Sequence, residues 1–174
     1  FTILFYVFVY TIWLKRKTPQ NIVIGGAAGA LPPVIGWTIA TNSLSLEPIT
    51  FFLIIFFWTP SHFWALSLYK SDDYKKAKIP MLPLTNGIES TKINILVYSL
   101  LMLPMVILPY AIDFVGLVFL VPALMLTLYY NFLCFELYMY KKNKFNPKKA
   151  KTIFGYSILY LFLIFVIFLI DKIL

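Results

Sequence analysis

The sequence predicts an all-α membrane protein, a polytopic bundle of transmembrane helices that forms one domain over residues 1–174. Hydrophobic residues make up 61% of the chain and charged residues only 13%, whereas a soluble domain is about half apolar and about a quarter charged. The apolar runs reach about 20 residues, the length of a membrane-spanning helix, and show no period-2 alternation of barrel strands. Membrane lipid is therefore the expected surrounding, and no nucleic-acid partner is expected despite the net charge of +8.

The first element is the apolar run FTILFYVFVYTIWL, which is too short to cross a bilayer. No initiator methionine, positive n-region or small-residue cleavage site accompanies it, so a signal peptide is not expected. We expect a helix that has been cut through, in an N-terminally truncated chain. The single cysteine, Cys134, lies inside a later apolar run and is expected to be a packing residue with no disulfide partner.

Five full spans follow the partial helix, and the links between them alternate in charge. The predicted spans are Ile22–Thr41, Pro48–Tyr69, Asn94–Ile112, Val115–Tyr138 and Thr152–Ile170. The links KRKTPQ, KSDDYKKAKIPMLPLTNGIESTK and KKNKFNPKKAK hold every lysine and arginine of the chain except Lys172. The positive-inside rule then predicts cytoplasmic basic links and a C-terminus on the opposite side.

The first full span has small residues on one face, at Gly25, Gly29, Pro32 and Gly36. Such a face allows a neighbouring helix to approach closely. The Pro32–Pro33 pair removes two backbone donors and predicts a bend. Two interpretations remain open: the face serves helix packing alone, or the bend also helps to shape a central cavity.

The next span contains the only histidine of the chain, His62. Helical spacing places it on one face with Trp58, Ala65 and Tyr69, and this face leads to the two aspartates that follow the span. A lone intramembrane histidine is often a hydrogen-bonded packing residue. The alternative is a substrate contact, because ionisable groups within a membrane usually have a function.

The link over residues 70–93 combines the Asp72–Asp73 pair with several lysines, including Lys75 and Lys76. An ordinary solvated loop, or recognition of lipid headgroups, accounts for the lysines but not for the aspartates. A proton or ion pathway would place carboxylates inside the spans. Binding of a diphosphate with a divalent cation accounts for both charges, because magnesium takes one or two carboxylates plus phosphate oxygens and lysines neutralise the remaining charge.

The stretches YTIWLKRKTPQNIVIGGAAGALPPVIGW, WTPSHFWALSLYKSDDYKKAKIPMLPLTNG and TKINILVY resemble the protohaem IX farnesyltransferases, or haem O synthases, of the intramembrane UbiA-type prenyltransferase superfamily. The resemblance covers roughly residues 10–98. The last two spans resemble the family mainly in hydropathy. One departure is Ser61, where the family more often has proline; the preceding Pro60 kink is retained.

The resemblance implies a nine-helix bundle with its N-terminus in the cytoplasm, in which the five full spans are helices five to nine. The family's first aspartate-rich motif lies between helices two and three and is absent from this chain. The link over residues 70–93 matches the second motif, with Asp73 and Tyr74 aligned to the family's DY and Asp72 a weaker match. By resemblance, Asp72 and Asp73 are metal ligands, and together with Tyr74 they form the expected catalytic set. The expected substrate contacts are Lys15, Arg16, Lys17, Trp58, His62, Lys75 and Lys76, although the first three also serve topology.

The implied reaction is transfer of a farnesyl group from farnesyl diphosphate to a vinyl group of protohaem IX, which yields haem O and diphosphate for terminal oxidase assembly. Magnesium is the implied cofactor, the bacterial inner membrane the implied location, and haem-handling or oxidase-assembly proteins the implied partners. Two alternatives remain: a prenyltransferase acting on an aromatic quinone precursor, and a non-catalytic membrane scaffold. By itself, the chain is expected to be inactive.

Overall fold

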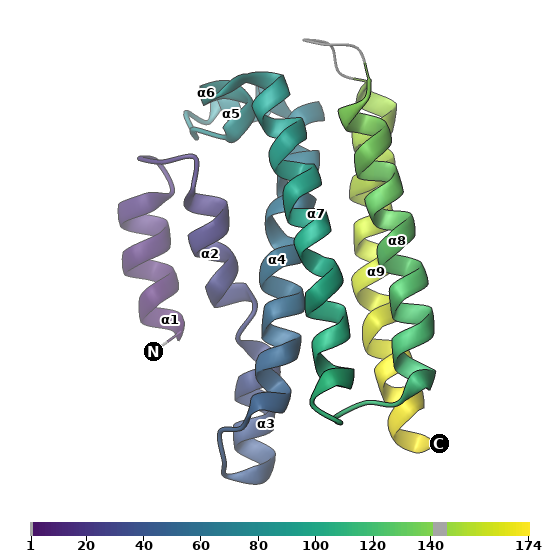
Figure 1. Ribbon diagram of the computed structural model, residues 1–174. Coiled ribbons are helices and arrows are strands. Elements are labelled where there is room, and N and C mark those ends of the chain that lie inside the picture. The colour runs from purple at the N-terminus through teal and green to yellow at the C-terminus, as the bar shows by residue number, and fades with distance from the viewer. Residues whose placement is uncertain (1, 141–145) are drawn as a thin grey trace.

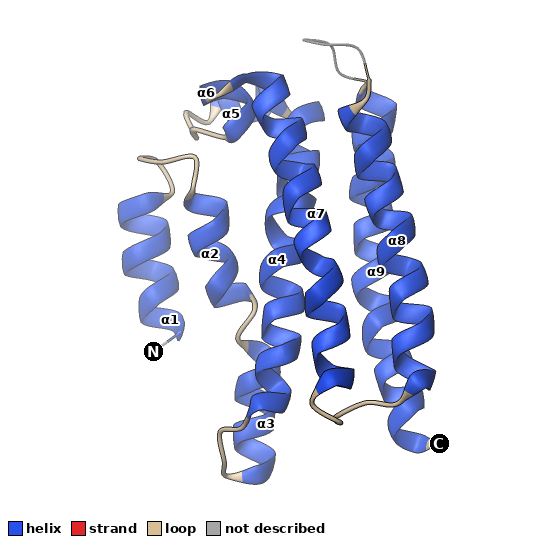
Figure 2. Cartoon of the chain, in the orientation of Figure 1, coloured by secondary structure: helices blue, strands red, loops and turns tan. Residues whose placement is uncertain are grey.

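The computed structural model describes residues 2–140 and 146–174, and within them it contains helices and connecting turns but no strand (Figures 1 and 2). Five of its helical segments are long and apolar enough to cross a membrane. The predicted all-α bundle is therefore confirmed. The KKNKF part of the third basic link, residues 141–145, lies outside the described residues.

The N-terminal part of the chain forms two helices that run side by side at one edge of the bundle (Figure 1). The first consists of α1 (Thr2–Leu4) followed by the π-type helix η1 (Phe5–Leu14), and the second is α2 (Asn21–Gly29). The chain then turns into α3 (Pro32–Thr41). The predicted bend is confirmed as a break before Pro32, because neither of two consecutive prolines can donate a backbone hydrogen bond to the preceding turn.

Helix α4 (Leu46–Tyr69) runs through the middle of the molecule. It contacts α2 and α3 on one side, and α7 and α9 on the other. Pro60 lies inside this helix, and the helix continues past it. The central position of α4 means that residues within a single turn of it can face either a packed core or the N-terminal helices.

The predicted link over residues 70–93 contains two short helices and the first turns of a third. These are α5 (Ser71–Lys76), α6 (Leu82–Thr85) and α7 (Gly87–Ala111). The prediction that the span begins at Asn94 was wrong, because the charged residues before it are already helical. Lys92 is fully buried and donates hydrogen bonds to the Glu89 carboxylate (2.8 Å) and to the backbone oxygen of Tyr140 (2.9 Å). A lysine with such partners can be buried. The charge of Lys92 therefore did not mark where α7 begins.

The last two helices are α8 (Leu117–Tyr138) and α9 (Pro147–Ile173). Helix α9 begins before the predicted Thr152, since Pro147 suits a first helical position and the Asn146 side chain accepts a hydrogen bond from the Lys148 backbone N–H at 2.9 Å. At its far end, the Asp171 carboxylate accepts hydrogen bonds from two backbone N–H groups at the start of α8, at 3.0–3.1 Å. The end of α9 thereby caps α8.

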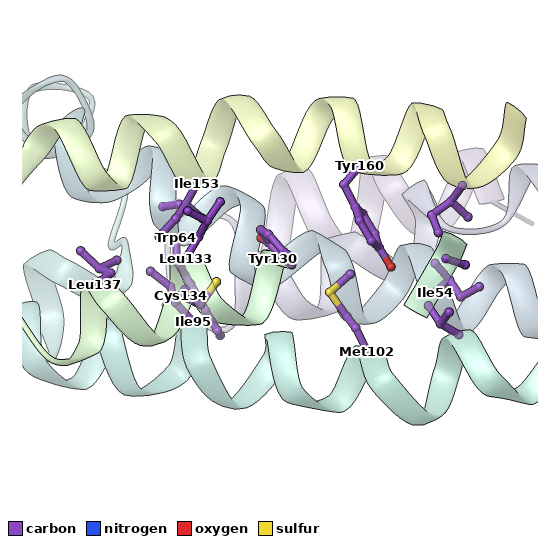
Figure 3. Packing of buried hydrophobic residues seen from close by; sticks show 14 of the residues in the cluster. Ile54, Trp64, Ile95, Met102, Tyr130, Leu133, Cys134, Leu137, Ile153 and Tyr160 are labelled. Atoms are coloured by element: carbon purple, nitrogen blue, oxygen red, sulfur yellow. The ribbon is translucent and has the colours of Figure 1, made fainter. Parts of the chain in front are cut away.

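Helices α4, α7, α8 and α9 enclose the hydrophobic core (Figure 3). Cys134 is buried in this core as a free thiol, as predicted. Ser61 is also buried, and its hydroxyl donates to the Trp58 carbonyl (3.0 Å) and lies 2.9 Å from the Tyr130 hydroxyl. The Ser61 hydroxyl, which a proline would lack, therefore links α4 to α8.

The predicted grouping of the basic links agrees with the arrangement of the helices. The η1–α2 connection, helices α5 and α6, and the helix ends that flank residues 141–145 all lie at one end of the bundle (Figure 1). The α3–α4 and α7–α8 connections lie at the other end. We call the first the basic end and the second the distal end.

Candidate functional site

An apolar hollow of about 360 Å³ lies between η1, α2, α4 and α9. Glycines of α2 form one of its walls, and aromatic rings of η1 and α4 form much of the rest. Its lining residues are Tyr6, Tyr10, Ile22, Gly25, Gly26, Gly29, Ile55, Trp58, Thr59, Phe63 and Leu161. This wall composition suits a long apolar chain, and aromatic faces can also stabilise a cationic carbon.

A second hollow, of about 190 Å³, adjoins the first and is more polar. Its polar side chains are Lys15 from the η1–α2 connection, Asn21 from the start of α2, and Tyr74 from α5. The remaining lining residues are Tyr10, Ile22, Phe63, Ile79 and Met81. Tyr10, Ile22 and Phe63 line both hollows, so a polar hollow, which we call the polar mouth, and an apolar hollow lie next to each other.

Glycine explains how α2 can form a wall of this site. A Cβ on Gly26 would lie 3.0 Å from the Thr59 side chain of α4, and one on Gly25 would collide with the Tyr10 ring. A Cβ on Gly29 would meet nothing within 4 Å. Gly25 and Gly26 therefore let the neighbouring helices approach, whereas Gly29 leaves space; that the bend at Pro32 shapes a cavity stays a prediction.

The predicted aspartates lie outside the hollows. Asp72 and Asp73 are exposed on α5, and Asp73 forms an ion pair with Lys70 at 3.3 Å. Only Tyr74 of the predicted catalytic set lines the polar mouth. Burial is the main cause that raises the pKa of Tyr74 above 10, with the charge of Asp73 also contributing, so its hydroxyl stays protonated and can donate a hydrogen bond at neutral pH.

The lysines and the arginine predicted to bind substrate also divide into one residue that lines the mouth and others that lie outside it. Lys15 is half-buried and lines the polar mouth. Arg16, Lys17, Lys75 and Lys76 are exposed at the basic end. These four contribute charge around the mouth rather than forming its wall.

The predicted histidine face forms, but Trp58 and His62 on this face already contact residues of α9. The His62 ring stacks on Trp58 at 4.3 Å between ring centres and on Phe154 at 4.6 Å. Its Nδ1 lies 2.6 Å from the Ser157 hydroxyl, and Trp58 donates to the Ser157 carbonyl at 2.9 Å. These contacts are those of a packing residue. His62 also borders a further apolar hollow of about 330 Å³, which shares Trp58 with the first.

Asn21 is a polar residue of the mouth that sequence reasoning missed. It is 1% exposed, and its side-chain Nδ2 donates to the Lys15 carbonyl at 3.0 Å, while its Oδ1 is buried with no hydrogen-bond partner. The sign of it in the sequence was that Asn21 places an amide side chain at the boundary between a basic link and an apolar span.

A divalent cation is compatible with these residues, although they do not form a complete metal site. No group of three or more His, Cys, Asp or Glu side chains in residues 2–140 and 146–174 could hold a metal. The exposed Asp72–Asp73 pair supplies two carboxylates outside the hollows. Magnesium usually takes few protein ligands and keeps several waters, so this set fits part of a magnesium–diphosphate site.

The fold and the site together describe an intramembrane helix bundle with a candidate site whose polar mouth and apolar hollow would suit an amphiphile with a polar head and an apolar tail. The chain belongs to the UbiA prenyltransferase family, whose model matches residues 1–158. No solved structure matches the chain significantly.

Curated relatives agree with this family. The chain is 98% identical over its whole length to a protoheme IX farnesyltransferase of Pelagibacter ubique (strain HTCC1062), of which it covers 57%. It is 52% identical to the protein of the same name from Parvibaculum lavamentivorans, over the whole chain and 55% of that protein. A third, from Afipia carboxidovorans, is 48% identical over 96% of the chain and 53% of the relative. The chain thus spans about half the length of the curated relatives it matches.

Proposed function

We propose that this chain is part of an enzyme that transfers a farnesyl group from farnesyl diphosphate to a vinyl group of protohaem IX, giving haem O and diphosphate. The observation that supports this most directly is the pair of adjoining hollows, in which a polar mouth with Lys15, Asn21 and Tyr74 lies next to an aromatic hollow. A prenyl diphosphate likewise has a polar head and an apolar tail. The 98% identical relative bears the corresponding name.

In this proposal the residues at the mouth hold the diphosphate head. Lys15 neutralises charge on the phosphate oxygens, and the protonated Tyr74 hydroxyl donates a hydrogen bond to them. The exposed lysines and Arg16 raise the local concentration of the anionic substrate. Magnesium, when bound through Asp72 and Asp73, would stabilise negative charge on the departing diphosphate.

The apolar hollow holds the tail and excludes water from the reacting carbon. Cleavage of the C1–O bond leaves an allylic cation beside aromatic rings such as Tyr10 and Trp58. The vinyl carbon of protohaem then forms the new C–C bond, and water adds to the resulting cation with loss of a proton. The hollow beside His62 and Trp58 is the candidate location for the porphyrin.

The remaining parts of the proposal concern the whole protein. We place it in the bacterial inner membrane, with the basic end facing the cytoplasm and the C-terminus outside, on the positive-inside rule. Haem-handling and oxidase-assembly proteins are its proposed partners. Because residues 2–140 and 146–174 contain no complete set of magnesium ligands, we expect the 174 residues alone to form no haem O.

The test uses the chain in the full-length context of its 98% identical relative, purified in detergent. Protohaem IX, farnesyl diphosphate and magnesium are added, and haem O is measured by chromatography and mass spectrometry. Formation of haem O that depends on all three supports the proposal. Prenylation of an aromatic quinone precursor in place of protohaem would favour the quinone alternative, and no prenylation of either acceptor would favour a scaffold.

A further inference from the structure

Helices α8 and α9 have a polar hollow of their own at the basic end of the bundle. It measures about 190 Å³ and is lined by Leu133, Glu136, Lys148, Lys149, Thr152 and Ile153. Lys149 forms an ion pair with Glu136 at 3.1 Å, whereas no carboxylate of residues 2–140 and 146–174 forms an ion pair with Lys148. Two lysines and one glutamate give this hollow a net charge of +1. The charge that remains unbalanced is that of Lys148.

An apolar hollow of about 440 Å³ lies further along the same two helices. Its lining residues are Pro122, Met125, Leu126, Tyr129, Tyr156, Leu163 and Ile167. On α8, Tyr129 of this hollow lies one helical turn from Leu133 of the polar one, and on α9 Tyr156 lies one turn from Thr152. The two hollows therefore follow one another along one face of the α8–α9 pair, whose helices contact each other and run side by side (Figure 1).

This face points outward and is separate from the candidate site. Met125 at its surface is 67% exposed, and neither hollow shares a lining residue with the polar mouth, the apolar hollow beside α2 or the hollow beside His62. The Tyr156 hydroxyl donates to the Leu126 carbonyl at 2.9 Å, and its ring packs edge-on against Tyr129 at 4.9 Å. Because that hydroxyl is bonded within the helix pair, the part of the face beyond the polar hollow is apolar.

The length and the charge of this face match a phospholipid. At 1.5 Å per residue, Tyr156 and Ile167 are roughly 16 Å apart along α9, and half of the hydrocarbon core of a bilayer is about 15 Å thick. The polar hollow lies at the helix ends, where headgroups are expected, and basic pockets between membrane-spanning helices bind anionic headgroups. We propose that this face binds one anionic phospholipid, with its phosphate beside Lys148 and an acyl chain in the apolar hollow. The single negative charge of a phosphodiester balances the net charge of +1, whereas a zwitterionic headgroup brings no net charge.

Two neighbouring residues allow matched substitutions. Lys151 is exposed on α9 within one turn of Lys148 but lines neither hollow, so Lys151→Gln removes the same charge from the same helix outside the site. Glu136→Gln changes the charge of the hollow in the opposite direction, because it frees Lys149 from its ion pair. That pair is partly exposed, so its loss has little effect on stability.

The experiment measures lipid binding and does not depend on farnesyl transfer. Phosphatidylglycerol is titrated into the full-length protein in detergent, and bound lipid is counted by native mass spectrometry. We expect Lys148→Gln to weaken binding about fivefold, the effect of one lysine on the binding of an anionic lipid. Glu136→Gln should tighten binding by about the same factor, and Lys151→Gln should bind as the wild type does. Phosphatidylethanolamine should bind more weakly than phosphatidylglycerol, and free glycerol phosphate, which has no acyl chain, should not displace the lipid.

Tighter binding by Glu136→Gln cannot result from a damaged fold, so this variant separates a loss of charge from a loss of structure. Unchanged affinity in Lys148→Gln would overturn the assignment. An equal loss in Lys148→Gln and Lys151→Gln would replace the site by a general attraction of the basic end for anions. Equal affinity for phosphatidylethanolamine, or displacement by glycerol phosphate, would exclude an anionic lipid held by both head and tail. A dimer that carries no lipid would assign this face to a second copy of the protein.

Discussion

The two sides of α4 have the same kinds of residues but different packing. On the side facing α7, α8 and α9, Ser61 and Trp64 are buried in a continuous core, and Ser61 contacts the Tyr130 hydroxyl. On the side facing η1 and α2, Trp58 and Phe63 line open space. Both sides are rich in aromatic rings, so composition does not distinguish them.

The difference arises from what each neighbouring helix presents to α4. Helices α8 and α9 present large side chains that fill the interior, such as Tyr130 and Tyr160, whose rings stack at 5.6 Å. Helix α2 presents glycines and ends after Gly29. We therefore propose the apolar surface that lacks a partner inside the bundle as the binding surface, while the packed side provides rigidity. Substitutions on the two sides should affect different measurements.

The largest effect is expected at the basic end, near the mouth of the open side. If Asp73 helps to hold magnesium against the diphosphate, as proposed, Asp73→Asn in the full-length protein should lower haem O formation by about two orders of magnitude, because stabilisation of the departing diphosphate by the cation is lost. Steady-state turnover at saturating magnesium measures it.

Asp113→Asn is the matched control, since Asp113 is exposed at the distal end and asparagine tolerates its φ of 56°. That variant should behave as the wild type. Wild-type turnover of Asp73→Asn would remove the second aspartate motif from the mechanism.

A smaller effect is expected inside the apolar hollow. Gly29→Val should fill part of the space that is open around Gly29 and raise the KM for farnesyl diphosphate about tenfold, on the scale of mild overpacking. The shorter geranyl diphosphate should be affected less. The matched control is Gly36→Val, because Gly36 also has open space but does not line the hollow. Equal changes in both variants would show that helix propensity, not the hollow, is responsible.

On the packed side, substitutions should change stability and leave substrate binding unchanged. Asp171→Asn weakens the cap of α8 by removing the carboxylate charge, and should cost about 1 kcal/mol. Thermal unfolding in detergent measures the loss as a fall in Tm of about 2–4 °C. A changed KM for farnesyl diphosphate in this variant would contradict the separation of the two sides.

The smallest effect on ligand binding is expected at the boundary between the sides. His62 has both ring faces covered and its Nδ1 engaged by Ser157. His62→Ala should therefore leave the Soret band of bound protohaem unchanged, and shift haem affinity less than about twofold. Haem titration of both forms measures this. A shifted Soret band with weaker binding would instead establish His62 as a haem ligand.

The sequence by itself determined the all-α architecture, the membrane-spanning lengths and the break at Pro32, because these follow from local hydropathy and backbone chemistry. The burial of Cys134 followed for the same reason. The boundaries of α7 were not predictable in this way, since the burial of Lys92 depends on the backbone oxygen of Tyr140, far away in sequence.

The site required the tertiary structure. Sequence patterns identified Lys15 and Tyr74, but only packing shows that these two line a common mouth while Asp72 and Asp73 remain exposed beside it. Asn21 could not be selected from the sequence, because an unpaired oxygen is a property of its surroundings and not of its residue type. Which face of α4 is filled and which is open was decided by the sizes of side chains on other helices, so no local pattern contains that information.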